Sequence, residues 1–393
     1  MEAEADFDSG LLSTEVSHRR RSASVSEDYF RGVRFSLVVR EYEGGVPEEL
    51  RDFFRSPMFL LSERAASTEE PLASEAARPS ENERQPRQCK FVAAQLGYYS
   101  DRFIPAFIHA CNSEKPHHRD PEITRGYWAR TNAITSMVVQ FVQLAGPSTQ
   151  ILNLGAGFDT LYWRLKDAGL SFYKFVELDF SSVTAKKICQ IKRNKNVNLT
   201  EFFSKTVEEK QHSDLHAGDY HLIGTDLRQI REFDGKLATA DLDFSQPTLV
   251  IAECVFVYMD EAHSHELIED VAKRFETVAV LNYEQVNMTD TFSKVMSTNL
   301  SSRGIHLPGL STCKSLQTQK QRFLNVGFSH VQAWTISEIY SQHFQRQEVS
   351  RIESLEPLDE KELLTQLLEH YCLVYAFKDS TKMRESLAQL QVK

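Results

Sequence analysis

The sequence predicts a doubly wound α/β protein with a seven-stranded, mostly parallel sheet that carries helices on both faces. Three observations lead to this prediction. Short apolar runs alternate with helical segments from Ile151 onward, a glycine turn follows the first run, and acidic residues follow several of the later runs. This alternation is typical of parallel strands that are buried on both faces and joined by crossover helices.

Seven apolar runs have the length and composition of buried strands. Five of them cover residues 150–154, 172–177, 221–224, 248–252 and 278–282. Two later runs, 329–335 and 371–377, complete the predicted sheet, and a helix from about residue 358 to 370 leads into the last one. No internal repeat is evident, which excludes solenoids and propellers.

The 393 residues divide into a short polar part and a long globular part. Residues 1–88 are rich in Ser, Glu, Arg and Ala, and the stretch 62–88 is almost free of large apolar side chains, so we expect a mostly disordered extension that ends in a linker. Residues 89–393 contain all seven predicted strands, and we expect them to form one domain.

Charge and cysteine usage exclude several classes of protein. The net charge of -10 argues against nucleic acid as a partner, because phosphate binding needs clustered Lys and Arg. No apolar run reaches the roughly 18 residues of a membrane span, and the six cysteines are scattered singly without a C-x-x-C pair. We therefore expect a cytoplasmic protein that does not bind membranes, and we expect it to be a monomer.

Three histidines, His212, His216 and His221, lie close together in the sequence HSDLHAGDYH. Their spacing does not match a zinc-hydrolase motif. We expect ordinary loop histidines and no metal site.

The segment ILNLGAGFDT predicts a strand that ends in a tight glycine turn and is followed by a helix. Gly155 and Gly157 allow a sharp turn and a close approach of the backbone to a ligand. The dinucleotide fingerprint G-x-G-x-x-G is incomplete, because Thr160 takes the place of the third glycine. This difference disfavours NAD without excluding it.

Acidic residues stand near the ends of three further predicted strands. Glu177 and Asp179 follow the second strand at the spacing of a ribose-binding acid, Asp226 follows the third strand, and Glu253 follows the fourth. Each acid alone could equally be a helix N-cap or a solvated loop charge. Together they predict one crevice rich in carboxylates, which suits a sulfonium with adenine and ribose better than a pyrophosphate. S-adenosylmethionine is therefore the preferred cofactor.

Several blocks in sequence order closely resemble leucine carboxyl methyltransferase: CKFVAAQLGYY, PEITRGYWAR, ILNLGAGFDTLYWRLKD, IGTDLR, LVIAECVFVYM, NYEQVNM and EVSRIESLEPLDEKELL. The resemblance runs from about Cys89 to Phe377 and does not reach residues 1–88. It implies a class I, Rossmann-like methyltransferase fold. It also implies methylation of the C-terminal leucine carboxylate of the type-2A protein phosphatase catalytic subunit, a modification that regulates assembly of the phosphatase holoenzyme.

The resemblance also implies roles for individual residues. Lys90 and Arg130 resemble the basic residues at the methionine end of the cofactor, and Arg130 and Tyr258 are the candidate catalytic residues. The other residues that resemble cofactor contacts are Gly155 in the glycine loop, Asp179 for the ribose, Asp226 and Leu227 for the adenine, and Glu253 near the methionine moiety.

Other functions stay open at this stage. A related enzyme of wybutosine formation on transfer RNA shares the domain but resembles a fusion with a C-terminal propeller, and these 393 residues contain no such repeats. A non-catalytic module that binds the phosphatase tail and a small-molecule O-methyltransferase are two further alternatives. We expect the segment 291–321, inserted after the fifth strand, to hold the protein partner.

Overall fold

The computed structural model describes residues 81–108, 120–194, 197–302, 304–359, 361–379 and 383–393, and side chains from residue 87 onward. All of these residues belong to one unit, Gly44–Lys393. Helix α4 begins at Glu81 and ends at Gln95, so it crosses the predicted boundary at residue 88. The rest of the predicted extension, residues 1–80, lies outside the described residues.

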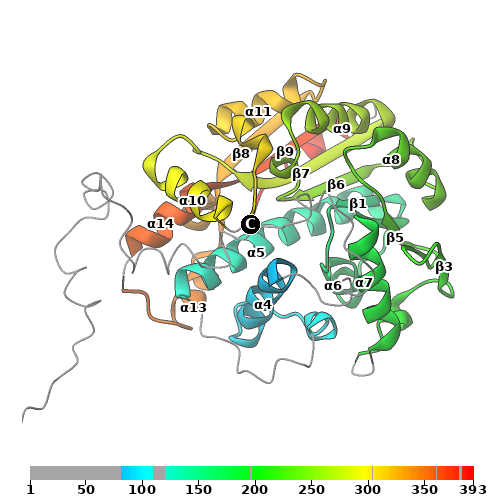
Figure 1. The fold of residues 1–393 in the computed structure, drawn as a ribbon, viewed down its shortest axis with the longest axis horizontal. Helices are drawn as coiled ribbons and strands as arrows, with labels where there is room; N and C mark the ends of the chain where they lie inside the picture. Colours follow the sequence, from blue (N-terminus) through cyan, green and yellow to red (C-terminus); the bar gives the residue numbers. More distant parts are fainter. Residues whose placement is uncertain (1–80, 109–119, 195–196, 303, 360, 380–382) are drawn as a thin grey trace, which may run out of the picture. The chain divides into compact units, whose positions relative to one another are not determined.

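A mixed sheet forms the centre of this unit (Figure 1). Its strand order is β3-β4-β5-β2-β1-β6-β7-β9-β8. The five strands from β5 to β7 are parallel, and the strands at both edges are antiparallel. The strands are β1 (Gln150–Leu154), β2 (Lys174–Asp179), β3 (Glu208–Lys210), β4 (Asp214–His216), β5 (Tyr220–Gly224), β6 (Thr248–Glu253), β7 (Thr277–Gln285), β8 (His330–Thr335) and β9 (Tyr371–Asp379).

The predicted fold class is confirmed, but the predicted count of seven strands is wrong. The structure adds β3 and β4, which form a short antiparallel hairpin beside β5. Each has three residues, and β3 is largely exposed and charged, so neither produces the apolar run by which a strand is recognised in a sequence. The second strand also begins and ends two residues later than predicted, at Lys174 and Asp179.

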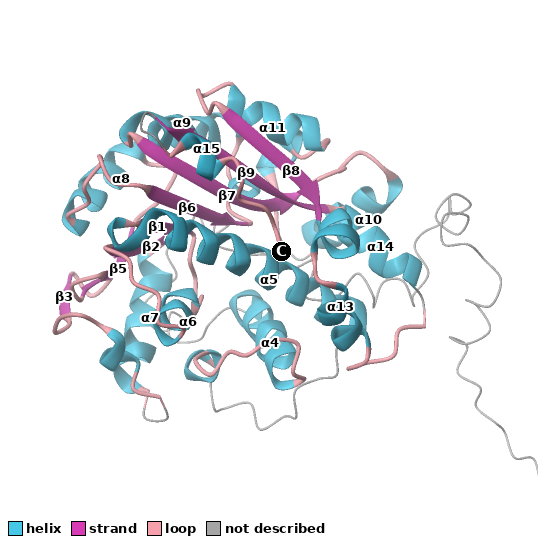
Figure 2. Cartoon of the chain, turned by 180° about the vertical axis from the view of Figure 1, so that it is seen from behind, coloured by secondary structure: helices cyan, strands magenta, loops and turns pink. Residues whose placement is uncertain are grey.

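The helices lie on both faces of the sheet, as Figures 1 and 2 show. One apolar core joins α8, α9 and α11 to one face through residues such as Phe233, Leu267 and Phe323. Three further helices contact strands of the same sheet: α5 contacts β7, α7 contacts β5, and α14 contacts β9. The longer helices besides α4 are α5 (Pro121–Ala145), α6 (Leu161–Asp167), α7 (Ser181–Arg193), α8 (Ile230–Leu237), α9 (Glu261–Arg274), α10 (Thr291–Ser301), α11 (Leu316–Leu324), α13 (Arg346–Glu353) and α14 (Lys361–Glu369).

Helix α5 is the longest of the described helices and has clear start and stop signals. Pro121 occupies its first turn, where a missing N–H costs nothing, and Gly146 ends it with a φ of +76°. Its buried residues include Ile123, Tyr127 and Ala133. Despite its 25 residues, α5 is not apolar enough to cross a membrane, and the same is true of every other helix in the described part of the chain.

The strand order places a topological switch point between β1 and β6. From β1 the chain continues outward through β2 and β5 on one side, and through β6 and β7 on the other side. The register aligns the strand ends, because Leu154 of β1 pairs with Leu178 of β2 and with Ala252 of β6. Open α/β sheets bind ligands outside the carboxyl ends of the strands at this kind of position.

Candidate functional site

A pocket lies at the carboxyl ends of β1, β2, β5 and β6. These strands are neighbours in the sheet, so segments that lie far apart in the sequence meet there. The lining residues are Gly155, Asp179, Phe180, Thr225, Asp226, Leu227, Arg228, Cys254, Val255, Tyr258 and Met259. Five of the residues predicted from the sequence belong to this lining: Gly155, Asp179, Asp226, Leu227 and Tyr258.

The glycine turn and the acid of β2 are joined directly. Gly155 and Gly157 have φ values of +56° and +49°, a left-handed conformation that favours glycine. The Gly157 N–H donates to Oδ2 of Asp179 over 2.7 Å, and the Phe180 N–H donates to Oδ1 over 2.8 Å. A carboxylate has about four acceptor positions, so Asp179 can still accept from ligand hydroxyls while it fixes the turn.

Glu177 lies apart from the pocket lining. Its side chain is fully buried and accepts from Lys187 over 2.5 Å and from the Tyr220 hydroxyl over 2.7 Å. Burial raises the pKa of Glu177 to about 7, while Lys187 and Tyr220 act in the opposite direction. Because Lys187 also donates to the carbonyl of Asp159 over 2.8 Å, Glu177 supports the glycine turn through Lys187.

Asp226 forms a bidentate ion pair with a residue that the sequence interpretation did not single out. Arg228 Nε donates to Asp226 Oδ1 over 2.9 Å, and Arg228 Nη2 donates to Oδ2 over 2.8 Å. Burial acts to raise the pKa of Asp226, but the hydrogen bonds and charge of Arg228 outweigh it and lower that pKa. Asp226 is therefore an anion at the pocket edge, and the Leu227 side chain beside it is apolar and buried.

A cluster of three charged residues lies next to this pocket, in which Arg130 is buried and the other two residues are partly buried. Lys90 of α4 and Arg130 of α5 both form ion pairs with Glu253, the last residue of β6, and the Lys90 Nζ to Glu253 Oε1 distance is 3.0 Å. The two helices pack against each other, which brings the cations together although 40 residues separate them. Glu253 directly precedes Cys254 and Val255 of the pocket lining.

Two features of this cluster suit an anionic ligand. The formal charge of Lys90, Arg130 and Glu253 together is +1 at neutral pH. Nη1 of Arg130 is buried and has no hydrogen-bond partner among the described residues. A buried guanidinium N–H without an acceptor is costly, so the site is suited to bind a carboxylate.

Burial and charge act against each other in this cluster. Burial opposes the charged form of Arg130, yet the neighbouring Glu253 carboxylate raises the pKa of Arg130 well above its usual value. Burial also acts to raise the pKa of Glu253, but Arg130 and Lys90 outweigh it and lower that pKa. Arg130 and Glu253 therefore both carry charge at neutral pH.

Tyr258 ends the short 3-10 helix η6 (Phe256–Tyr258), which follows β6 and forms one wall of the pocket. The neighbouring Cys254 is buried, and burial raises the pKa of its thiol to about 12. Such a thiol stays protonated at neutral pH, so Cys254 is a packing residue and not a nucleophile.

The prediction of loop histidines is confirmed for His212, which lies in an exposed turn, and is wrong for the other two. His216 lies in β4 and His221 in β5, both buried, and their Nδ1 atoms are 2.7 Å apart. Burial, followed by the charge of Lys174, lowers the pKa of His221 to about 3. Within the residues that the structure describes, no group of three or more metal-ligating side chains occurs.

Several residues of the site were not singled out in the sequence. Five lining residues follow the ends of β2, β5 and β6: Phe180, Thr225, Arg228, Val255 and Met259. Their place directly after predicted strands is the one feature of the sequence that could have indicated them. Tyr283 of β7 gave no such signal, yet its ring lies 4.8 Å from the Arg130 guanidinium carbon.

Comparisons with known proteins indicate a family for this chain. Residues 90–272 match the family model described as leucine carboxyl methyltransferase. Leucine carboxyl methyltransferase 1 of Caenorhabditis elegans is 46% identical over 292 residues, which cover 74% of this chain and 88% of that protein. The tRNA wybutosine-synthesizing protein 4 of Rattus norvegicus is 33% identical over 291 residues, but they cover 42% of its length against 72% of this chain.

Solved structures resemble the chain more distantly. A proposed methyltransferase from Thermobifida fusca gives a TM-score of 0.46 at 10% identity and covers 75% of this chain and 94% of its own. Sequence identity to relatives that match over most of their own length is the stronger evidence. The chain belongs to the leucine carboxyl methyltransferase family, and this membership confirms the predictions of an enzyme and of S-adenosylmethionine as its methyl donor.

Proposed function

We propose that this chain methylates the α-carboxylate of a C-terminal leucine, and that its substrate is the type-2A protein phosphatase catalytic subunit. The observation that carries the proposal is the partly buried Lys90–Arg130–Glu253 cluster beside the pocket, with its formal charge of +1 and the unpartnered Nη1 of Arg130. We further propose a monomer, and a location in the cytoplasm that is consistent with the free thiols of Cys189, Cys254, Cys313 and Cys372.

The residues present fit S-adenosylmethionine at both ends of the molecule. Asp179 and Asp226 supply acceptors for ribose hydroxyls and for the adenine edge, and Leu227 supplies apolar contact. At the other end, the unpartnered Nη1 of Arg130 suits the carboxylate of the methionine moiety, with Lys90 nearby. Gly155 lets the backbone approach the ligand where a Cβ would clash.

No catalytic base is needed for this reaction. A C-terminal carboxylate has a pKa of about 3.5 and is already the anionic nucleophile at neutral pH. When bound, S-adenosylmethionine supplies an electrophilic methyl group, which the carboxylate oxygen takes as the carbon–sulfur electron pair passes to sulfur. The chain has to place the oxygen in line with that methyl carbon and to exclude water.

Arg130 and Tyr258 are the proposed catalytic residues. We assign the Arg130 guanidinium chiefly to the cofactor carboxylate, because a tight ion pair with the leucine carboxylate would lower its nucleophilicity. Tyr258 belongs to the wall that separates the pocket from its surroundings, where its nearly buried ring helps to exclude water. Low hydration favours the reaction, because an anion and a cation combine to give neutral products.

The decisive experiment measures transfer of labelled methyl from S-adenosylmethionine to the phosphatase catalytic subunit. We expect transfer to the intact subunit and none to a subunit that lacks its terminal leucine. Equal labelling of the shortened subunit would refute leucine specificity. Turnover with small carboxylic acids alone would favour a small-molecule methyltransferase, and labelling of transfer RNA would favour the wybutosine alternative.

Calorimetry with S-adenosylhomocysteine separates the enzyme from a non-catalytic module that only binds the phosphatase tail. We expect binding with a micromolar Kd. If the folded chain binds the tail but no S-adenosylhomocysteine, the non-catalytic alternative is correct.

A further inference from the structure

The wall segment, residues 254–259, supplies four of the pocket-lining residues: Cys254, Val255, Tyr258 and Met259. It has little regular structure of its own. Cys254 has a left-handed φ of +55°, and the η6 turn is held by hydrogen bonds of 3.2 and 3.1 Å from the N–H groups of Tyr258 and Met259. A segment this short depends on its neighbours for a fixed conformation.

Glu284 of β7 contacts the wall segment but does not line the pocket. Its carboxylate is fully buried, and Oε1 accepts from the Val257 N–H over 2.5 Å. Its Oε2 accepts from Arg322 of α11 over 2.8 Å. Because both charged side chains are almost completely buried, the pair contributes little net stability but fixes the carboxylate in one orientation.

Gly309 packs against the backbone of the wall segment. It lies in the 3-10 helix η7 (Pro308–Thr312), and a Cβ on it would come within 2.7 Å of the carbonyl oxygens of Phe256 and Met259. These are backbone atoms, so the added carbon could be accommodated only if the wall segment or η7 moved. The Arg322 guanidinium also lies 4.9 Å from the centre of the Phe256 ring.

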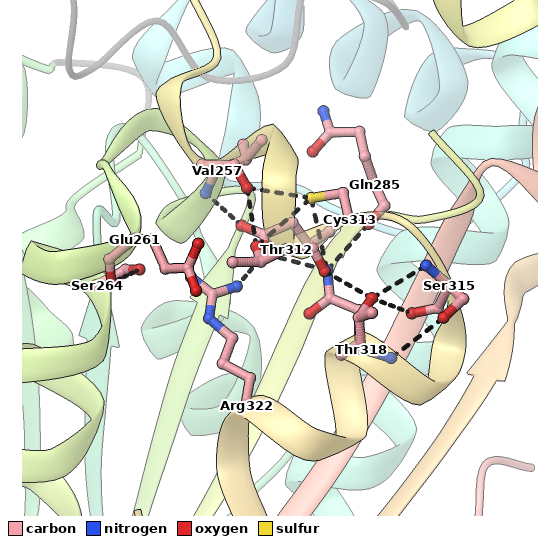
Figure 3. A network of polar contacts seen from close by, with 12 residues as sticks. Val257, Glu261, Ser264, Gln285, Thr312, Cys313, Ser315, Thr318 and Arg322 are labelled. Carbon is pink, nitrogen blue, oxygen red and sulfur yellow. Dashed lines mark hydrogen bonds and ion pairs between the residues drawn. The ribbon is translucent and has the colours of Figure 1, made fainter. Parts of the chain in front are cut away.

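The neighbouring helix α11 holds η7 in place. Figure 3 shows Thr312 and Cys313 beside Val257, with Ser315, Thr318 and Arg322 on the adjoining turn and helix. Thr318 Oγ1 donates to the carbonyl of Thr312 over 2.9 Å, and Ser315 and Thr318 form a capping box at the start of α11. The back of the wall segment is therefore tied to the segment 291–321, which the sequence analysis assigned to the protein partner.

We propose that Glu284, Arg322 and Gly309 are positioning residues that hold the wall segment in the conformation needed for cofactor binding. None of the three lines the pocket, so they act through Val257 and the backbone around it. The inference rests on the proposed function, in that this pocket takes S-adenosylmethionine. It extends the site to a carboxylate, a guanidinium and a glycine behind it.

The first test is Gly309→Ala in the full chain, with Gly235→Ala as its matched control. A Cβ on Gly235, which is exposed in α8, meets nothing within 4 Å, so the control changes the same atoms without a clash. We expect the Kd for S-adenosylhomocysteine, measured by calorimetry, to rise about tenfold in Gly309→Ala and to stay at the wild-type value in Gly235→Ala. A folded Gly309→Ala protein with the wild-type Kd would overturn the proposal.

The second test separates the hydrogen bond to the wall from the ion pair. Glu284→Gln with Arg322→Leu keeps an acceptor for the Val257 N–H but removes both charges, whereas Glu284→Leu with Arg322→Leu removes the acceptor as well. We expect a Kd within about threefold of wild type for the first pair and a rise of about tenfold for the second. Equal Kd values for the two pairs would contradict the assigned role of the carboxylate.

Thermal unfolding of each variant shows whether it is folded. If a variant in one of the two tests fails to fold, the other test still decides the question. Wild-type binding is the reference throughout. If wild type itself binds no S-adenosylhomocysteine, the proposed function fails. If wild type binds and the Gly309 and Glu284 variants bind equally well, the positioning role alone fails.

Discussion

Arg130 is the residue on which the proposed chemistry depends most. Its guanidinium is buried between the Glu253 carboxylate and the Tyr283 ring, and Nη1 still lacks an acceptor among the described residues. The Glu253 charge keeps it protonated in spite of burial. A permanent cation with one free donor can anchor a ligand carboxylate without any change of protonation state.

Replacing Arg130 with Ala should abolish detectable methyl transfer, a loss in kcat/KM of about 100-fold or more, because the ligand carboxylate loses its anchor and its alignment. The fold should persist, since Glu253 keeps Lys90 at 3.0 Å. Transfer of labelled methyl checks the activity, and circular dichroism checks the fold. The matched control is Arg231→Ala, on the exposed side of α8, which should turn over normally. Near-normal turnover of folded Arg130→Ala would disprove the role.

Glu253 should make the stability of the protein depend on pH, because its folded-state pKa lies below the value of about 4.3 for an unfolded glutamate. A depressed pKa adds stability above that value, and this stability is lost as the pH falls toward the folded-state pKa. Glu253→Gln should therefore unfold at a lower temperature than wild type at pH 7, and the gap should narrow below about pH 4. Thermal unfolding between pH 3 and about pH 8 measures the gap, and a gap independent of pH would show that Glu253 is not the titrating group.

Among the elements, α9 is the helix that begins immediately after the wall segment. Asp260 is its N-cap, and its side chain accepts from the His263 N–H over 2.9 Å. The cap satisfies one of the backbone donors that a helix leaves unpaired in its first turn. It therefore contributes to helix stability without lining the pocket.

Asp260→Ala should lower the free energy of unfolding by about 1 kcal/mol, as the loss of an N-cap usually does. Asp260→Asn, which keeps an acceptor, should lose much less. Urea denaturation measures both, and calorimetry should find the same Kd for S-adenosylhomocysteine in both proteins. A weakened Kd for Asp260→Ala at unchanged stability would mean that the helix start contributes to the pocket and not only to the fold.

At the scale of the whole molecule, the sequence predicted the sheet well where burial is uniform. Every residue of β1 is buried, and its bounds were predicted without error. The exposed, charged strand Glu208–Lys210 was missed because hydrogen bonding to β4, and not apolar burial, makes it a strand. The sequence also could not decide between Glu177 and Asp179, because a shift of two residues along β2 determines which carboxylate reaches the pocket.

The cluster of Lys90, Arg130 and Glu253 shows a second limit of prediction from the sequence. Lys90 and Arg130 lie on helices before the first strand, and no periodicity or spacing links them to Glu253. Family resemblance indicated them, and the packing of α4 on α5 explains how they meet. The Glu284–Arg322 pair was not predicted at all, because a contact between a strand and a later helix leaves no local signal in the sequence.

The described residues, which all lie between 81 and 393, contain the nine strands of the sheet, the pocket and the charged cluster. A protein that begins at Glu81 should therefore bind S-adenosylhomocysteine within about threefold of the full-length Kd and unfold at a similar temperature. Calorimetry and thermal unfolding of the two proteins make the comparison. A shortened protein that is folded but binds about tenfold more weakly would assign part of the cofactor site to residues 1–80.

The position of β9 has a consequence for biosynthesis. This strand pairs with β7 along nine residues and with β8 along six, so it separates two strands that precede it in the chain. Until the residues of β9 have been synthesised, β7 has an open edge and β8 has no neighbour in the sheet. The part of the sheet beyond β7 can form only after Asp379 has left the ribosome. Nascent chains that end before Asp379 therefore keep an unpaired strand edge, which makes them targets for chaperones and quality control.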